Sequence, residues 1–356
     1  AATKRPSTRW KGPLNWLPLI RWSTTTWAMF TGPLAVNARL NSNGVGRYRL
    51  LIPKTKTARP IPKIPVMVAG MRTTQAAVLG VANAGFAWAK VNLTLHVTGQ
   101  RSDGYHLLDS LVVRAGVGDR IAVSPSDQLE LFIDGPYGGA APHDDRNLVV
   151  RAARLLDAGA GRGARLHLTK NLPAAAGIGG GSADAATALR LLSAHWGLPV
   201  PEDVARLGAD VPVCLHDTPQ RMEGIGERLT PAPKLPPCWL VLINPNKSAA
   251  TPEVFSRLES RANAPMPKEL PQFTSAPAFA AWLATQRNDL EAPAIEVVPE
   301  VADCLGSLQD ALMARMSGSG ATCFGLYETE ALAQRAVTRI AAAQPGWWVT
   351  AAPMLG

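Results

Sequence analysis

The stretch that decides the fold reads Pro173-Ala174-Ala175-Ala176-Gly177-Ile178-Gly179-Gly180-Gly181-Ser182-Ala183. Four glycines in five positions leave backbone N–H groups without side-chain cover, so they can close around an anion. The alanine- and leucine-rich residues 183–195 that follow predict a helix. Because the N-terminus of a helix adds partial positive charge at the same place, the stretch predicts a loop that holds phosphate.

Two common phosphate-binding motifs do not fit this loop. A Walker A motif needs a lysine directly after its glycines, and none follows here. A dinucleotide fingerprint beginning at Gly177 would need glycine at position 182, where Ser182 stands. A flexible glycine-rich linker is the structural alternative, but a strong helix former directly behind the glycines is not linker composition.

The sequence around the loop predicts a mixture of strands and helices. Alternating apolar residues over 87–97 predict a strand, and residues 101–106 predict a turn with a polar and aromatic tip. A helix is expected over 147–156, and further strands over 120–123, 129–133, 165–169 and 239–245. The proline-rich residues 231–237 predict a domain boundary. We therefore expect an α+β fold with domains over 84–230 and 231–356.

The basic charge of the chain is concentrated at its start. Residues 1–70 hold 12 Lys and Arg and no acidic residue, whereas residues 71–356 hold 24 Lys and Arg against 27 acidic residues. Because the body is slightly acidic, a nucleic-acid-binding function for it loses its main support. The sequence predicts a basic extension over residues 1–80, disordered or non-native. Three interpretations remain for it: an organelle transit peptide, a basic interaction arm, or an upstream addition with Met71 as the natural start.

Cysteine spacing favours a reducing compartment, and hydropathy argues against a membrane span. Cys214, Cys238, Cys304 and Cys323 are scattered, without the spacing of a disulfide framework or a zinc site. No apolar run reaches the ~18 residues of a membrane span. We expect a cytoplasmic protein without membrane or nucleic-acid partners, a monomer or weak homodimer. Organelle import through residues 1–70 is the alternative.

Three segments in chain order resemble the GHMP kinase superfamily. They are residues 173–183, Ala89-Lys90-Val91-Asn92-Leu93 and Ser317-Gly318-Ser319-Gly320-Ala321-Thr322. Residues 99–106 and 207–213 are further similar to the branch that phosphorylates a cytidine diphosphate sugar alcohol of the non-mevalonate isoprenoid pathway at its 2-hydroxyl. The resemblance covers about residue 84 to near the C-terminus. It implies a ribosomal-protein-S5-domain-2-like N-terminal domain with a left-handed βαβ element, a ferredoxin-like C-terminal domain, and a cleft between them.

The resemblance implies a base and a cation at the reacting hydroxyl. Phosphoryl transfer needs a group that takes or orients the hydroxyl proton and cations that offset the moving charge. Asp210 would be the base, and Lys90 would pair with it. ATP would lie on residues 173–183 with Asn147 and Lys170 at the adenine end, and Mg²⁺ would arrive with ATP rather than at a protein metal site. Taken alone, Asp210 reads as a cap or turn residue and Lys90 as a solvated strand residue.

The acceptor side is also assigned through the resemblance. Tyr105 and Phe255 would stack on cytosine while His106 reads the polar edge of the base. Asn92, Thr251, Gly318 and Ser319 would lie near the substrate. The alternatives are that Phe255 belongs to the core and that the Tyr105–His106 turn has no role.

The chain departs from the family pattern at two places. The segment between the predicted helix and Asp210 is shorter by about one helical turn. Asp184 stands where relatives often carry Asn and is expected to cap the helix or lie near Mg²⁺. Two alternatives to the implied activity follow: another GHMP kinase, of homoserine or mevalonate type, or a catalytically impaired nucleotide-binding homologue.

Overall fold

The structure is a computed structural model that describes residues 36–40, 46–50 and 83–356. The chain divides into two compact units, Ala1–Ala69 and Gly70–Gly356. In the first unit, β1 (Val36–Leu40) pairs antiparallel with β2 (Gly46–Leu50), a hairpin that the sequence patterns do not predict. The rest of the predicted basic extension, up to residue 80, lies outside the described residues.

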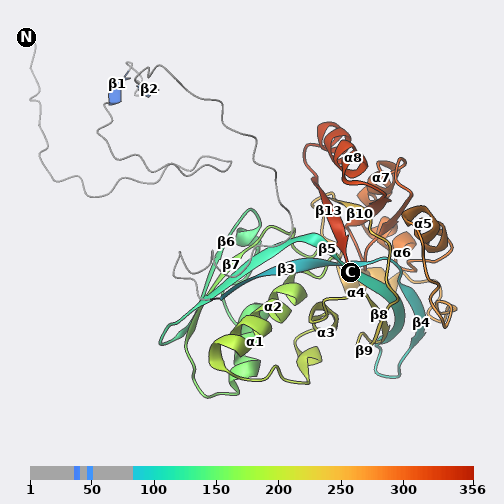
Figure 1. Cartoon of the computed structure of the whole chain (residues 1–356), viewed down its shortest axis with the longest axis horizontal. Helices are drawn as coiled ribbons and strands as arrows, with labels where there is room; N and C mark the ends of the chain where they lie inside the picture. Colours follow the sequence, from blue (N-terminus) through green and yellow to red (C-terminus); the bar gives the residue numbers. More distant parts are fainter. Residues whose placement is uncertain (1–35, 41–45, 51–82) are drawn as a thin grey trace, which may run out of the picture. The chain divides into compact units, whose positions relative to one another are not determined.

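The long strand β5 (His106–Ser124) organises the first half of the second unit. It pairs antiparallel with β3 (Asn83–Asn92), β4 (His96–Gln100), β7 (Ala164–Thr169) and β8 (Gln220–Gly224). Strand β6 (Leu129–Asp134) runs parallel to β7, and the connection between them carries η2 (Gly138–Ala140) and α1 (Leu148–Asp157). Helix α1 packs with α2 (Gly180–Trp196) beside the sheet (Figure 1). The half ends with η3 (Val204–Arg206), α3 (Val211–Cys214) and β9 (Arg228–Pro231).

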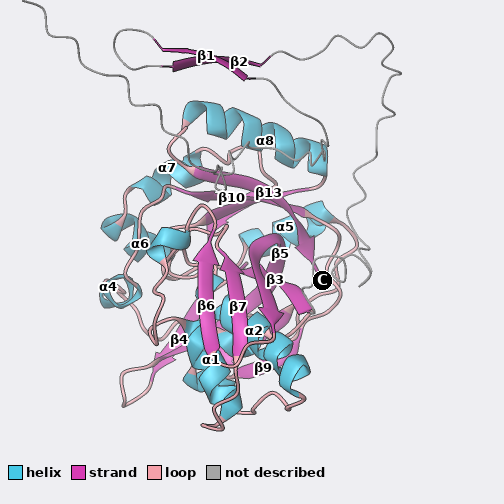
Figure 2. Cartoon of the chain, turned by 90° about the vertical axis from the view of Figure 1, so that its left-hand side faces the viewer, coloured by secondary structure: helices cyan, strands magenta, loops and turns pink. Residues whose placement is uncertain are grey.

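The second half has ferredoxin-like topology. Strands β10 (Trp239–Asn244), β11 (Met313–Met316), β12 (Cys323–Tyr327) and β13 (Trp348–Leu355) form an antiparallel sheet in the order β11-β12-β10-β13. Helix α8 (Glu330–Ala343) lies along β10 and β13 (Figure 2). Between β10 and β11 the chain forms α4 (Thr251–Ser256), α5 (Ala276–Ala284), α6 (Glu291–Val297) and α7 (Glu300–Gly306). The two halves share one continuous sheet because the end of β13 pairs with β5.

The strand predicted over residues 87–97 is wrong in one respect, since the structure divides it. Strand β3 ends at Asn92 and β4 begins at His96. Between them the chain makes other bonds: the N–H of Leu95 donates to the carbonyl of Arg287 at 2.8 Å, and Thr94 Oγ1 accepts from the N–H of Leu111 at 2.8 Å. The break interrupts the strand just past Asn92, and β4 resumes the pairing with β5 at His96.

The helix predicted to begin at residue 183 begins one turn earlier, at Gly180, with Gly179 as its N-cap. The glycines at 180 and 181 are therefore helical, not loop. Their poor helix propensity matters little there, because the N–H groups of a first turn have no intrahelical acceptor in any case. These free N–H groups point out of the helix end.

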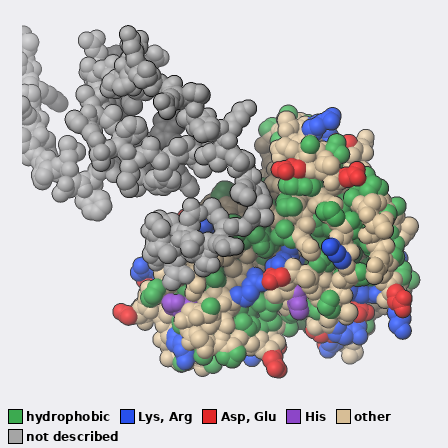
Figure 3. All heavy atoms as spheres, viewed as in Figure 1, with side chains coloured by type: hydrophobic (Ala, Val, Ile, Leu, Met, Phe, Trp, Pro, Cys, Tyr) green, Lys and Arg blue, Asp and Glu red, His purple; other side chains and the backbone are tan. Residues whose placement is uncertain are grey.

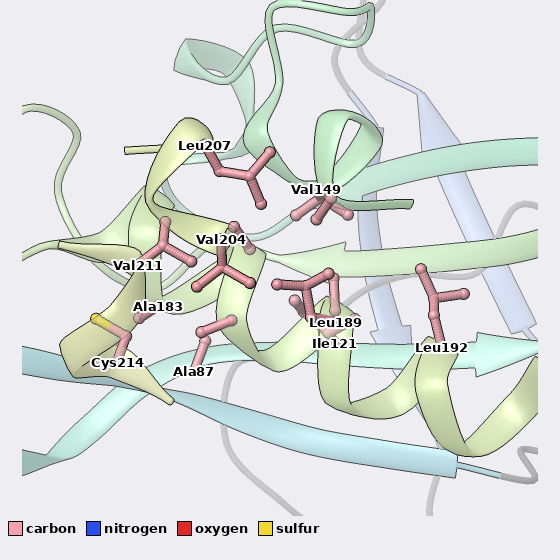
Figure 4. Packing of buried hydrophobic residues seen from close by; sticks show 14 of the residues in the cluster. Ala87, Ile121, Val149, Ala183, Leu189, Leu192, Val204, Leu207, Val211 and Cys214 are labelled. Atoms are coloured by element: carbon pink, nitrogen blue, oxygen red, sulfur yellow. The ribbon is translucent and has the colours of Figure 1, made fainter. Parts of the chain in front are cut away.

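Buried alanine side chains on α2 let this helix approach the sheet closely. Ala183, Leu189 and Leu192 of α2 are buried with Ala87 of β3 and Ile121 of β5 in one apolar cluster (Figure 4). Truncating a fully buried leucine of this kind to alanine typically costs about 2–5 kcal/mol of stability. This packing holds the N-terminus of α2, and thus the glycine loop, against β3.

Candidate active site

The glycine loop contacts a second glycine loop from the other half of the unit. Gly177 has a φ of 72°, and a Cβ built on it would lie 2.6 Å from the carbonyl oxygen of Ser317. The Ser317 hydroxyl donates to the carbonyl of Gly177 at 3.1 Å and accepts from the N–H of Asn92 at 3.0 Å. The backbones of the two glycine loops therefore lie in close contact, and the bonds of Ser317 fix the first glycine loop against β3.

Lys90 and Asp210 form an ion pair although 120 positions separate them in the sequence. Lys90 lies on β3, and its N–H donates to the carbonyl of Ile178 in the glycine loop at 2.9 Å. Asp210 is the residue before α3. Lys90 Nζ lies 3.0 Å from Asp210 Oδ2, with the lysine side chain 6% and the aspartate side chain 34% exposed. The ammonium is thus nearly buried, while the carboxylate can be reached from a cavity.

Two cavities meet at this pair. One, of about 780 Å³, lies on the side of Tyr105, His106 and Phe255. The other, of about 430 Å³, lies over residues 173–177, Asn147 and Lys170. The residues that line both cavities are Lys90, Ser182, Asp210, Thr251, Gly318 and Ser319. A molecule in each cavity would therefore meet the other beside the carboxylate of Asp210.

Short polar contacts shape the junction of the cavities. Thr251 Oγ1 and Ser319 Oγ are 2.8 Å apart, which joins the start of α4 to the second glycine loop. Asn288 supports that loop from behind, since its Nδ2 donates to the carbonyls of Met316 at 2.8 Å and Gly318 at 2.9 Å. Asn288 was not found by sequence reasoning, because a lone asparagine carries no pattern that separates it from a turn residue.

The larger cavity has an aromatic wall and unused hydrogen-bonding atoms. The rings of His106 and Phe255 stack at a centroid distance of 4.5 Å, and Tyr105 lines the same cavity with its side chain exposed. Among the described residues, His106 Nε2 and Asn92 Oδ1 are buried without hydrogen-bond partners. Burial and then the nearby Arg261 guanidinium lower the pKa of His106, so the neutral ring is favoured. Arg261 is a lining residue that the sequence motifs did not indicate.

The smaller cavity has a buried charge network behind its floor. Lys170 lies between the carboxylates of Asp119 and Asp184, and its Nζ is 2.7 Å from Asp184 Oδ2. Asp119 Oδ1 also accepts the N–H of Leu172 at 2.9 Å, just ahead of the glycine loop. Asn147 caps α1 by accepting the N–H of Val149 at 2.9 Å. The role of Asn147 and Lys170 at the adenine end stays a prediction.

The structure corrects the cap expected from Asp184. Helix α2 has Gly179 as its N-cap and no side-chain capping bond, because the Asp184 carboxylate points to Lys170 instead. Burial raises the pKa of Asp184 to about 7, with Lys170 acting against this and Asp119 adding to it. Two carboxylates facing one ammonium leave one negative charge uncompensated, so a proton on Asp184 near neutral pH follows from the geometry.

Asp184→Asn is expected to remove a pH dependence of stability. A pKa raised from 3.8 to about 7 means that the folded chain binds the proton more tightly than the unfolded chain. The resulting stabilisation is full below about pH 3.8 and is lost as pH rises through about 7. The melting temperature of the variant should therefore rise relative to the unaltered protein between pH 5 and pH 8. A constant difference over that range would contradict a proton bound to Asp184 near neutral pH.

The comparisons with known proteins agree with this fold. The description "GHMP kinases N terminal domain" matches residues 147–220, and "GHMP kinases C terminal" matches residues 273–346. The glycine loop lies in the first match and the second glycine loop in the second. The fold and the paired cavities thus define a small-molecule kinase of the GHMP class.

The more similar relatives narrow the class. A 4-diphosphocytidyl-2-C-methyl-D-erythritol kinase of Cereibacter sphaeroides is 57% identical over 277 residues, which is 76% of this chain and 99% of the relative. The kinase of the same name from Ruegeria pomeroyi is 56% identical over 269 residues, 74% of this chain and 96% of the relative. The chain belongs to the 4-diphosphocytidyl-2-C-methyl-D-erythritol kinase family.

Solved structures place the fold in the same class. A crystal structure of 4-(cytidine 5'-diphospho)-2C-methyl-D-erythritol kinase matches with a TM-score of 0.65 at 36% identity, covering 77% of this chain and all of that one. A homoserine kinase from Cytophaga hutchinsonii matches with a TM-score of 0.55 at 19% identity, covering 76% of this chain and 94% of the other. At that identity the second match shows the fold alone.

Proposed function

We propose that this chain transfers the γ-phosphoryl group of ATP to the 2-hydroxyl of 4-diphosphocytidyl-2-C-methyl-D-erythritol, giving ADP and the 2-phosphate in isoprenoid precursor synthesis. The observation that carries the proposal is the meeting of two cavities at the Lys90–Asp210 pair. The family relationship supports the identity of the acceptor.

ATP fits the smaller cavity. The first turn of α2 offers free N–H groups and positive partial charge, and glycines keep side chains away from that end. In this assignment residues 173–183 hold the phosphates, and Asn147 and Lys170 lie toward the adenine end. Within residues 83–356, no group of three or more His, Cys, Asp or Glu is arranged to hold a metal. Mg²⁺ would arrive with ATP and be held mainly by its phosphate oxygens, where it would offset their charge.

The acceptor fits the larger cavity. Cytosine would stack between Tyr105 and Phe255. His106 Nε2, which has no hydrogen-bond partner in this structure, would then bond to the polar edge of the base. The sugar-alcohol end would then point toward Asn92, Thr251, Gly318 and Ser319. Asp210 would accept the proton of the attacking hydroxyl, and Lys90 would orient that carboxylate and offset charge on the moving phosphoryl.

The short segment before Asp210 is the reason to consider an impaired homologue. Against that alternative, the structure keeps Asp210 within 3.0 Å of Lys90 and open to both cavities. An active kinase is thus the better-supported function, and acceptors of homoserine or mevalonate type remain as tests of specificity.

A coupled ADP-release assay tests the proposed function. The full chain should release ADP with 4-diphosphocytidyl-2-C-methyl-D-erythritol, and CDP should compete with that acceptor. Homoserine and mevalonate should give only background turnover. ADP release with one of these two and none with the cytidine compound would reject the proposed acceptor, and none with any of the three would favour the impaired homologue.

Arg261→Gln is expected to raise the pKa of His106. Removing a neighbouring positive charge favours the protonated imidazole, although burial, the larger cause, remains. The acid side of the pH profile for acceptor binding should shift to higher pH, because protonation removes the ring's acceptor nitrogen. NMR titration of His106 measures the shift directly. An unchanged or lower pKa in the variant would disprove the coupling.

The domain boundary proposed at residues 231–237 is supported by β10–β13, all of which follow it.

A cytoplasmic location is supported by four buried cysteines without disulfides. None of the described helices is long and apolar enough to cross a membrane. Basic and acidic side chains are interspersed on the face seen in Figure 3. A monomer or weak homodimer stays a prediction, and deleting residues 1–70 would show whether retention on heparin depends on them.

A further inference from the structure

Helix α3 has an ion pair just beyond each of its ends. At the N-terminal end, Asp210 pairs with Lys90 at 3.0 Å. Beyond the C-terminal end, Asp217 Oδ1 accepts from Arg114 Nη2 at 2.7 Å and from Arg190 Nη1 at 3.3 Å. The four-residue helix is too short to hold its own position by internal hydrogen bonds. Its position therefore depends on the burial of Val211, Val213 and Cys214 in the apolar cluster and on the contacts that hold its two ends.

The two cations that pair with these carboxylates, Lys90 and Arg114, are neighbours on the sheet. Lys90 of β3 and Arg114 of β5 are direct partners in the antiparallel register. Side chains of such partners share one face, with Cβ atoms about 4.5–5.5 Å apart. Two adjacent cations of the sheet thus hold two carboxylates of one segment, Asp210 and Asp217. Arg190 adds a third contact from α2, with Nη1 3.5 Å from the carbonyl of Leu215.

Arg114 is poorly supplied with other partners. Its side chain is 13% exposed, and its Nε is buried with no hydrogen-bond partner among the described residues. Without Asp217, the guanidinium would remain largely buried and uncompensated beside the Lys90–Asp210 pair. It would then compete with Lys90 for the carboxylate of Asp210.

We propose that Arg114, Asp217 and Arg190 form a clamp that positions Asp210, so that a carboxylate preceded by a shortened segment still faces the acceptor hydroxyl. The clamp residues act through α3 and are positioning residues. This inference rests on the proposed function for its kinetic consequence, but its structural part does not.

Cys214 provides a readout that is independent of catalysis. It is the last residue of α3, and its side chain lies in the apolar cluster beneath the helix (Figure 4). Burial raises the pKa of the Cys214 thiol to about 12, so alkylation requires α3 to open. Cys323, buried in β12 of the other half, serves as an internal reference.

The test compares Asp217→Asn, Asp217→Glu, Arg114→Met and the Arg114→Met/Asp217→Asn double variant. We expect Asp217→Asn to lower kcat about 10-fold or more with the KM for ATP unchanged, since misplacing a reacting group by about 1 Å can cost about 100-fold. Iodoacetamide should alkylate Cys214 at least about 10-fold faster, with Cys323 unchanged. Asp217→Glu should restore both properties, and the double variant should be no worse than the poorer single variant.

Asp145→Asn is the matched control. It removes a carboxylate from the Arg154–Asp145 pair, 2.6 Å long, whose arginine side chain is 62% exposed. The carboxylate of Asp217 is itself 79% exposed, but its partner Arg114 is only 13% exposed. The Asp145 variant should therefore leave both the alkylation rate and kcat unchanged. An unchanged Cys214 rate in Asp217→Asn would overturn the clamp, as would an unchanged kcat. A wild-type chain without turnover would overturn the proposed function instead, and the Cys214 rates would still decide whether the clamp holds α3.

Discussion

Asp210→Asn is expected to lower kcat by about 100- to 10,000-fold, the usual contribution of a positioned general base. The amide keeps the size of the side chain but cannot take the hydroxyl proton. ATP affinity should stay within a few fold of the unaltered value, because Asp210 lies where the smaller cavity meets the larger one, whereas the glycine loop lines the smaller cavity itself. Single-turnover kinetics and calorimetric titration with a non-hydrolysable ATP analogue measure the two quantities separately.

Asp203→Asn is the control for that substitution. Asp203 lies seven positions earlier, and its ion pair is the exposed one with Arg206 at 3.7 Å. Its loss should leave kcat unchanged. Equal loss of turnover and ATP binding in Asp210→Asn would contradict the role of Asp210 as the base and indicate that the loop had been displaced.

Gly177→Ala is expected to weaken ATP binding by roughly 100-fold or more and to destabilise the fold. The left-handed backbone alone costs a non-glycine residue about 1–2 kcal/mol. The added Cβ would also lie 2.6 Å from the Ser317 carbonyl oxygen and 2.7 Å from that of Gly320, so one of the two loops must move. A shift of about 1 Å in the loop that holds phosphate is enough for an effect of this size.

Gly306→Ala is the matched control for that change. Gly306 ends α7, it has no left-handed φ, and a Cβ there would meet no atom within 4 Å. Nucleotide titration and thermal unfolding of both variants should separate them clearly. If Gly177→Ala bound ATP as tightly as Gly306→Ala does, the contact between the two glycine loops would not matter for the nucleotide.

The elements that the sequence predicted best are those with local patterns. Residues 147–156 and 165–169 are close to α1 and β7, because each has a regular period and a turn or cap beside it. Strand β5 was predicted only over residues 120–123, although it runs from His106 to Ser124. Its glycines and its buried Asp109 and Asp119 interrupt the apolar alternation, and their place in the strand depends on partners far along the chain.

The candidate site likewise combines residues that lie in local sequence motifs with residues whose partners are distant in the chain. Lys90, Asp210 and the glycine loop were predicted through ordered motifs, and the structure brings them together. The partners of Lys170, Asp119 and Asp184, could not be paired from the sequence, because 51 and 14 positions respectively separate each from the lysine. Arg261 and Arg114 likewise have no motif, since a lone arginine reads as solvated surface until its neighbours are known.

A crystal structure of Asp210→Asn with ATP and 4-diphosphocytidyl-2-C-methyl-D-erythritol would test the central claim most directly, because that variant should hold both substrates without turnover. We expect the 2-hydroxyl oxygen about 3–3.5 Å from the γ-phosphorus, beside residue 210 and Lys90 Nζ. An acceptor bound with that hydroxyl directed away from Lys90, or an ATP whose γ-phosphate lies away from residues 177–182, would contradict it.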